Sequence, residues 1–137
     1  MNKISYIKKK LQGPVFSIIT PFKSNQEIDY DSLKRYINFL YDNGAEVFYV
    51  MFYNSRLGLL NRDEILNINK FCIQEVKKLS RKNIIICAEP YHCSTKESIK
   101  FVKYFHKNGA DVVSLVFGEK FYNKKQVFSH FENIHNQ

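Results

Sequence analysis

Runs of consecutive apolar residues alternate along the chain with segments whose apolar residues recur at helical spacing. The runs are rich in Val, Ile and aromatic residues and lie at 15–19, 47–52, 84–88 and 112–117. Short runs of this kind are typical of strands buried on both faces of a parallel sheet. Amphipathic stripes between and after them predict four helices, over 33–40, 65–79, 99–105 and 124–134. The pattern therefore predicts an α/β fold of order βαβαβαβα.

Polar residues at the element boundaries support this division. Capping-box spacing predicts helix starts at Asn61, Ser94 and Asn123, and Asp29 is the expected cap of the first long helix.

The two halves of the chain also carry a repeat. Segment 40–47 resembles segment 105–112, with Gly44 and Gly109 at the same place and an offset of 65 residues. Both glycines fall just past a predicted helix end, where a left-handed conformation is needed. The offset corresponds to two strand–helix units, so the chain reads as four consecutive units.

Composition narrows the class of protein. Lys and Arg number 21 against 13 Asp and Glu, a formal charge of +8. The basic residues are spread along the helices apart from the run Lys8-Lys9-Lys10, which favours a solvated surface over a nucleic-acid or membrane partner. Three cysteines without a CxxC pair, no apolar run of membrane-span length and no signal-type segment predict a reducing cytoplasm.

Four parallel strands leave two architectures open, an open doubly wound sheet or half of a (β/α)₈ barrel. The open sheet would usually have a glycine-rich phosphate turn after its first strand, whereas residues 20–23 read Thr-Pro-Phe-Lys. In either case an active surface would lie at the carboxyl ends of the strands.

An ordered set of motifs resembles the dihydrodipicolinate synthase / N-acetylneuraminate lyase family. The motifs are the strand ending in Thr-Pro-Phe at 13–22, Gly-Ala-Glu at 44–46, the helix starts at 60–64 and 94–99, Gly-Ala-Asp at 109–111, and 130–134. The resemblance covers residues 13–134. It implies that 13–137 form half of a (β/α)₈ TIM barrel, four strand–helix units, behind a basic amino-terminal extension at 1–12.

The resemblance also implies a chemistry. Members of the family bind pyruvate as a Schiff base on a lysine of the sixth strand, without a cofactor or metal, and perform aldol addition or cleavage. The matched segment ends near the fourth helix and lacks the position of that lysine. The expectation is a divergent aldolase or lyase half that is inactive alone on pyruvate-type keto acids.

The substrate-binding candidates lie at the ends of the first two strands. The family's Gly-Thr-Thr-Gly-Glu loop aligns with Phe52-Tyr53-Asn54-Ser55-Arg56. Phe and Tyr fill space that the small residues leave for the substrate carboxylate, while Asn54 and Arg56 offer donors. Thr20, Tyr53, Asn54 and Arg56 are therefore candidates for a remodelled anion site, and loss of the pocket is the alternative.

The candidate catalytic residue is Tyr122. The family uses a tyrosine after the fourth strand to relay protons, and Tyr122 fits that role only if the loop has shifted; otherwise it is an aromatic packed on the rim. Lys23 and Lys120 stand at strand ends, but nothing in the sequence predicts the desolvation that a nucleophilic lysine needs.

The end of the third predicted strand has residue types that could hold a metal or form a Cys–His pair. Glu89, His92 and Cys93 share one turn, but adjacent side chains usually point apart and no second cluster has ligand spacing. No metal site is expected.

Three hypotheses about the function remain. One is the amino-terminal half of an enzyme that takes a small keto acid. Another is a non-catalytic assembly module whose exposed sheet edges pair in a homo-oligomer or with a complementary carboxyl-terminal half. The third is a decayed, marginally folded product.

Overall fold

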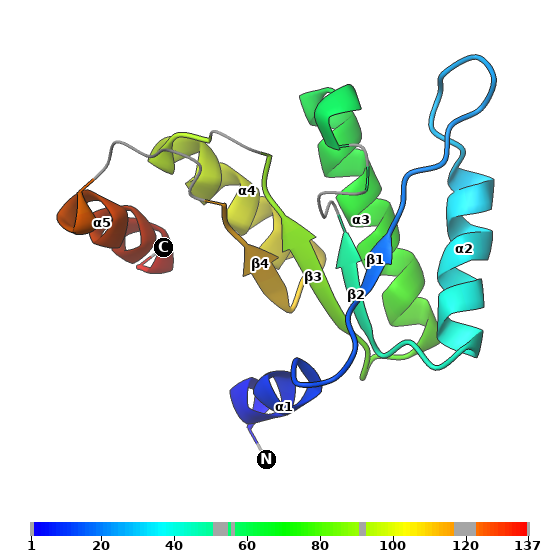
Figure 1. Ribbon diagram of the computed structural model, residues 1–137, viewed down its shortest axis with the longest axis horizontal. Helices are drawn as coiled ribbons and strands as arrows, with labels where there is room; N and C mark the ends of the chain where they lie inside the picture. Colours follow the sequence, from blue (N-terminus) through cyan, green and yellow to red (C-terminus); the bar gives the residue numbers. More distant parts are fainter. Residues whose placement is uncertain (1, 51–54, 56, 91–92, 117–122, 137) are drawn as a thin grey trace.

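Strands and helices alternate along the chain (Figure 1). The computed structural model describes the 137 residues apart from 1, 51–54, 56, 91–92, 117–122 and 137. Its strands are β1 (Phe16–Ile18), β2 (Val47–Val50), β3 (Ile84–Ala88) and β4 (Val112–Ser114). Its helices are α1 (Lys3–Lys10), α2 (Tyr30–Asp42), the 3₁₀ helix η2 (Leu57–Leu59), α3 (Arg62–Leu79), α4 (Thr95–Asn108) and α5 (Lys124–His135).

The strands form one parallel sheet in the order β1-β2-β3-β4. Phe48 at the centre of β2 is in register with Phe16 of β1 and Ile85 of β3. A doubly wound sheet reverses the direction of strand addition part-way, whereas the strands of a (β/α)₈ barrel follow one another in sequence order. The prediction of four parallel units in half-barrel order is confirmed.

The residues predicted to cap the helix starts do so in the structure. Asn61 and Asn123 each form a capping box with the residue three positions on, whereas Ser94 caps α4 only by accepting from the Glu97 backbone N–H at 3.3 Å. The Asp29 side chain accepts a hydrogen bond from the Ser32 backbone N–H at 2.9 Å. Gly109, the α4 cap, has φ 98°, a left-handed conformation that a side chain would strain.

The main core lies between the sheet and helices α2, α3 and α4. In β2, Phe48 and Val50 point into it, as Ile85 and Cys87 do in β3. The helices supply the opposite wall with stripes that the hydrophobic pattern predicted, among them Leu33, Ile37, Ile68, Cys72, Val76 and Phe105.

A second, smaller cluster lies on the other face of the sheet, which would be the inside of a closed barrel. It consists of Val47, Ile84 and Ile86, hereafter the inner-face cluster. Tyr6 and Ile7 of α1 pack against it, so residues 1–12, for which the hydrophobic pattern predicted no element, include a docked helix.

The sides of the sheet remain open in the described part of the chain. Val15 and Ile19, which flank β1, and Val116 after β4 are all exposed. No helix among the described residues is long and apolar enough to cross a membrane.

Candidate functional site

The carboxyl ends of the strands form the candidate site, because the active sites of barrel enzymes lie at this end of the sheet. Thr20, two residues past β1, is buried at this end. The other four candidates, Tyr53, Asn54, Arg56 and Tyr122, lie outside the described residues. Their proposed roles remain predictions.

A hydroxyl pair bridges alternate strands on the inner face. The Tyr49 hydroxyl of β2 donates to Ser114 Oγ of β4 at 2.5 Å, over the intervening strand β3. The two residues are 65 positions apart, the offset of the sequence repeat. Sequence reasoning missed this pair, although the repeat offset and the layering of alternate strands in barrels would have pointed to it.

A buried carboxyl group lies at the end of β3. Glu89 is almost fully buried, and its Oε2 atom has no hydrogen-bond partner in the described structure. Burial raises the pKa of the Glu89 carboxyl, while the nearby Ser98 hydroxyl and the backbone of Val116 act in the opposite direction with smaller effect. Compared with water, the site therefore disfavours the charged form of this carboxyl group.

The Glu89→Gln variant is expected to be more stable than the wild type at pH 7 and no more stable at pH 4. Because the folded-state pKa is raised, the folded chain holds this proton more tightly, and its stability falls as pH rises above the ordinary value of 4.5. Glutamine cannot ionise, so it avoids this loss. The expected result is therefore a gain in the free energy of unfolding that appears at pH 7 and is absent at pH 4.

Urea unfolding at the two pH values measures this gain. Glu27→Gln, at an exposed carboxylate paired with Lys23, serves as the control and should show no such gain. The expectation would be contradicted if the free energy of unfolding of Glu89→Gln, relative to the wild type, were lower at pH 7 than at pH 4.

Cys93 does not have the properties of a nucleophile. Burial is the main cause that raises the pKa of Cys93 to about 11, and nearby acidic side chains such as Glu97 add to it. Its Sγ donates to the Pro90 carbonyl at 3.2 Å. His92 lies outside the described residues, and no group of three His, Cys, Asp or Glu side chains among those described is placed to hold a metal.

Alkylation of Cys93 should accordingly be slow. Iodoacetamide reacts with the thiolate, so a pKa raised from 9.0 to about 11 lowers the rate at pH 8 by about 100-fold relative to an ordinary thiol. Peptide mass spectrometry over a time course, with urea-unfolded protein as reference, measures the ratio. Equal rates in the folded and unfolded chain would contradict a raised pKa at Cys93, and a faster rate in the folded chain would show an activated thiol.

Two further side chains with candidate chemistry, Lys23 and His130, contact polar neighbours. Lys23 is exposed and forms an ion pair with Glu27 at 3.7 Å, so it is not desolvated. His130 Nδ1 lies 2.9 Å from Thr95 Oγ1, which links α5 to the start of α4. Lys120 lies outside the described residues.

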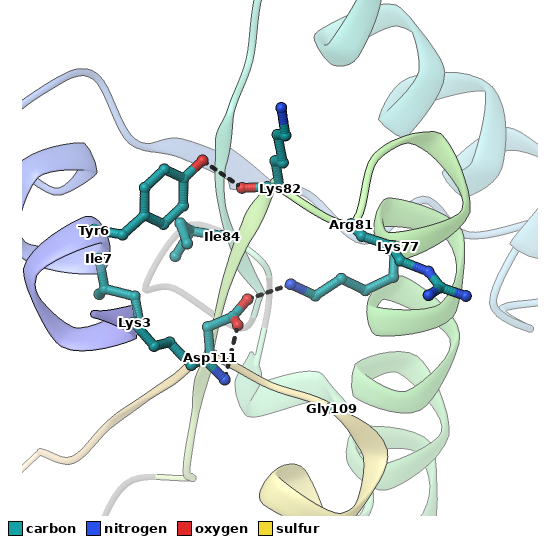
Figure 2. Close-up of a pocket in the computed structure, with 9 residues that line it drawn as sticks. All are labelled: Lys3, Tyr6, Ile7, Lys77, Arg81, Lys82, Ile84, Gly109 and Asp111. Atoms are coloured by element: carbon teal, nitrogen blue, oxygen red, sulfur yellow. Dashed lines mark hydrogen bonds and ion pairs between the residues drawn. The ribbon is translucent and has the colours of Figure 1, made fainter. Parts of the chain in front are cut away.

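A basic pocket lies at the opposite end of the sheet. It has a volume of about 520 Å³ and lies between α1, the end of α3 and the starts of β3 and β4 (Figure 2). Lys3 and Lys77 both contact Asp111 there, while Arg81 and Lys82 point away from the group. Two of these cations are already paired with Asp111 and the other two point away, so the pocket is not built as an anion site.

Known proteins match this chain closely enough to identify its family. A family model described as "Dihydrodipicolinate synthetase family" matches residues 10–137. A 4-hydroxy-tetrahydrodipicolinate synthase of Hydrogenobaculum sp. is 32% identical over 127 residues, which are 90% of this chain and 41% of that protein. One of Methanococcus aeolicus is also 32% identical, over 90% of this chain and 42% of that protein.

A solved structure gives the same result for the fold. The crystal structure of dihydrodipicolinate synthase from Bacillus clausii superposes with a TM-score of 0.82 at 22% sequence identity, and the match covers 95% of this chain and 43% of that one. The chain thus spans about two fifths of the length of the proteins that it matches. With its sequential parallel sheet and this match over nearly its whole length, the chain belongs to the dihydrodipicolinate synthetase family and corresponds to the amino-terminal portion of its barrel.

Proposed function

We propose that this chain supplies the amino-terminal half of a Schiff-base aldolase or lyase that acts on pyruvate-type keto acids in the cytoplasm. The observation that carries the proposal is the family match over residues 10–137, combined with a sheet that follows the first four strands of the barrel in order. Residues 13–137 are the half barrel in this proposal, and 1–12 its extension.

Taken alone, the 137 residues are proposed to be inactive. The family resemblance implies a lysine on the sixth strand, and the matched region corresponds to the first four. Without an amine to form the imine, a pyruvate carbanion has no comparable electron sink. Lys23 does not replace it, because its side chain is exposed and ion-paired with Glu27 and lacks the desolvation that a nucleophilic lysine needs.

The substrate-binding role stays with Thr20, Tyr53, Asn54 and Arg56, and the proton-relay role with Tyr122. Thr20 is buried at the carboxyl end of β1, as a residue that shapes the floor of such a site would be. The arginine would bind a substrate carboxylate in place of the backbone groups of the family's glycine loop.

Borohydride trapping tests the proposal. The chain is incubated with pyruvate, reduced with sodium borohydride and analysed by intact-mass and peptide mass spectrometry, beside the full-length Hydrogenobaculum synthase as positive control. We expect no reduced pyruvate adduct on any lysine of the 137-residue chain. A stoichiometric adduct would refute its inactivity.

A second function, a non-catalytic assembly module, is favoured by one observation. Val15, Ile19 and Val116 are exposed where further strands would continue the sheet. Apolar side chains and unpaired strand edges at these places favour association over a free surface. In this case the half barrel serves as a scaffold, and its carboxyl-end loops carry no reaction.

A further inference from the structure

Helix α1 lies across the amino-terminal ends of three strands. Near its start, Lys3 Nζ is 3.4 Å from Asp111 Oδ1, directly before β4. At its end, Lys10 Nζ is 2.5 Å from Glu46 Oε2, directly before β2. Seven residues of helix rise about 10.5 Å, and two strand spacings in a sheet cover about 9.6 Å. The length of α1 therefore matches the distance from β2 to β4.

The middle of α1 is fixed on the strand between them. The Tyr6 hydroxyl donates to the Lys82 carbonyl at 2.9 Å, two residues before β3 (Figure 2). Tyr6 and Ile7 pack on the inner-face cluster. With one contact to each of β2, β3 and β4, α1 covers the amino-terminal end of the half barrel, and it is hereafter called the floor.

The residues that hold this floor belong to the sequence repeat. Glu46 and Asp111 follow Gly44-Ala45 and Gly109-Ala110 at the same repeat position. Each binds a lysine of α1, one at either end of the helix. The family match begins at residue 10, so all of α1 except its last residue precedes the matched region.

Part of the apolar stripe on α1 is not buried against the sheet. Ile4, Ile7 and Leu11 lie on one side of α1 at spacings of three and four residues. Ile7 is half-buried against the inner-face cluster, but Ile4 is 65% exposed and Leu11 38% exposed. Val15, which leads into β1, is also exposed. The stripe is longer than the surface that covers it.

We propose that Ile4, Leu11 and Val15 form the seat for the amino-terminal strand ends of a carboxyl-terminal half-barrel, with α1 remaining as the floor of the completed barrel. This inference rests on the proposed function, because only half of a barrel needs a complement. The relatives are more than twice as long as the region matched here, so the occupant has the length of four further strand–helix units.

Charge favours such a half over a second copy of this chain. The chain carries a formal charge of +8, and four of its lysines lie on α1 itself, three of them in the run Lys8-Lys9-Lys10. Pairing two copies would bring these runs together at one mouth and raise the electrostatic free energy. An acidic complementary half would instead lower it.

The test uses the part of the Hydrogenobaculum synthase that lies beyond the matched segment as the probe. The two polypeptides are co-expressed, and their association is measured by size-exclusion chromatography with light scattering and by titration. We expect a 1:1 complex with the wild-type chain. Ile4→Asp and Leu11→Asp should weaken it at least tenfold, whereas Phe39→Asp, at an exposed aromatic on α2, should leave it unchanged. Circular dichroism of each variant confirms that the lone chain stays folded.

Three results would overturn the inference. One is wild-type affinity in the Ile4→Asp and Leu11→Asp variants, and another is failure of the wild-type chain to bind the probe. The third is a dimer of the lone chain that Ile4→Asp dissociates, because the occupant would then be a second copy. None of these depends on borohydride trapping, so the failure of this inference and of the proposed function can be told apart.

Discussion

Replacing Phe105 by alanine is expected to remove about 3–5 kcal/mol from the free energy of unfolding, the usual cost of truncating a fully buried Phe. Phe105 has no exposed surface and lies in the main core, with its ring centroid 5.7 Å from that of Phe101 and 6.1 Å from that of Tyr104. Domains are typically stable by only about 5–15 kcal/mol. The variant should therefore be close to unfolded at 37 °C.

Urea denaturation followed by circular dichroism measures this loss. The control is Phe39→Ala, at an aromatic side chain that is 59% exposed, where the change should stay within about 0.5 kcal/mol. A loss below 1 kcal/mol at Phe105 would mean that α4 does not pack on the sheet as described.

Replacing Asp111 by alanine is expected to cost about 2–3 kcal/mol. The Asp111 side chain is only 8% exposed, accepts from the Ile85 backbone N–H at 3.1 Å and contacts Lys77 Nζ at 2.5 Å and Lys3 Nζ at 3.4 Å. Its removal leaves a backbone donor and a partly buried ammonium without their acceptor. Lys77 also donates to the Asn83 carbonyl at 2.7 Å, which limits the cost.

The repeat supplies a matched control for Asp111. Glu46 stands at the same repeat position but is 61% exposed, and its contact is with Lys10 on the surface. Exposed ion pairs contribute about 0–1 kcal/mol, so Glu46→Ala should cost less than 1 kcal/mol. Equal losses at the two positions, measured by the same urea titration, would contradict the assignment of Asp111 as a buried anchor.

The 65-residue repeat explains why much of the fold was predictable. It places Gly109 in the left-handed turn where Gly44 has φ 90°. The same offset relates Tyr49 to Ser114, which hydrogen-bond across the sheet. Period and capping chemistry are local properties of the chain, so they can be read without knowing the tertiary structure.

Helix α1 and the roles of the candidate site residues could not be predicted from the sequence, because they depend on tertiary contacts. The α1 stripe is short and lies beside three consecutive lysines, and its docking depends on strand ends that are distant in sequence. The residue type of Glu89 allows a metal ligand, but alternation along β3 turns its side chain outward, away from the inner face and toward α4. The sequence around Tyr53 and around Tyr122 has no periodic pattern of apolar residues, so neither role could be decided from spacing.

Hydrogen exchange of the isolated 137-residue chain tests most directly whether it folds as a half barrel. Strands β2 and β3 are paired on both sides, whereas β1 and β4 each have one partner in the described sheet. We predict the slowest exchange in the amides of β2 and β3, with faster exchange in β1 and β4. Exchange in β2 and β3 as fast as in an unfolded chain would contradict a self-standing half barrel and favour a marginally folded product.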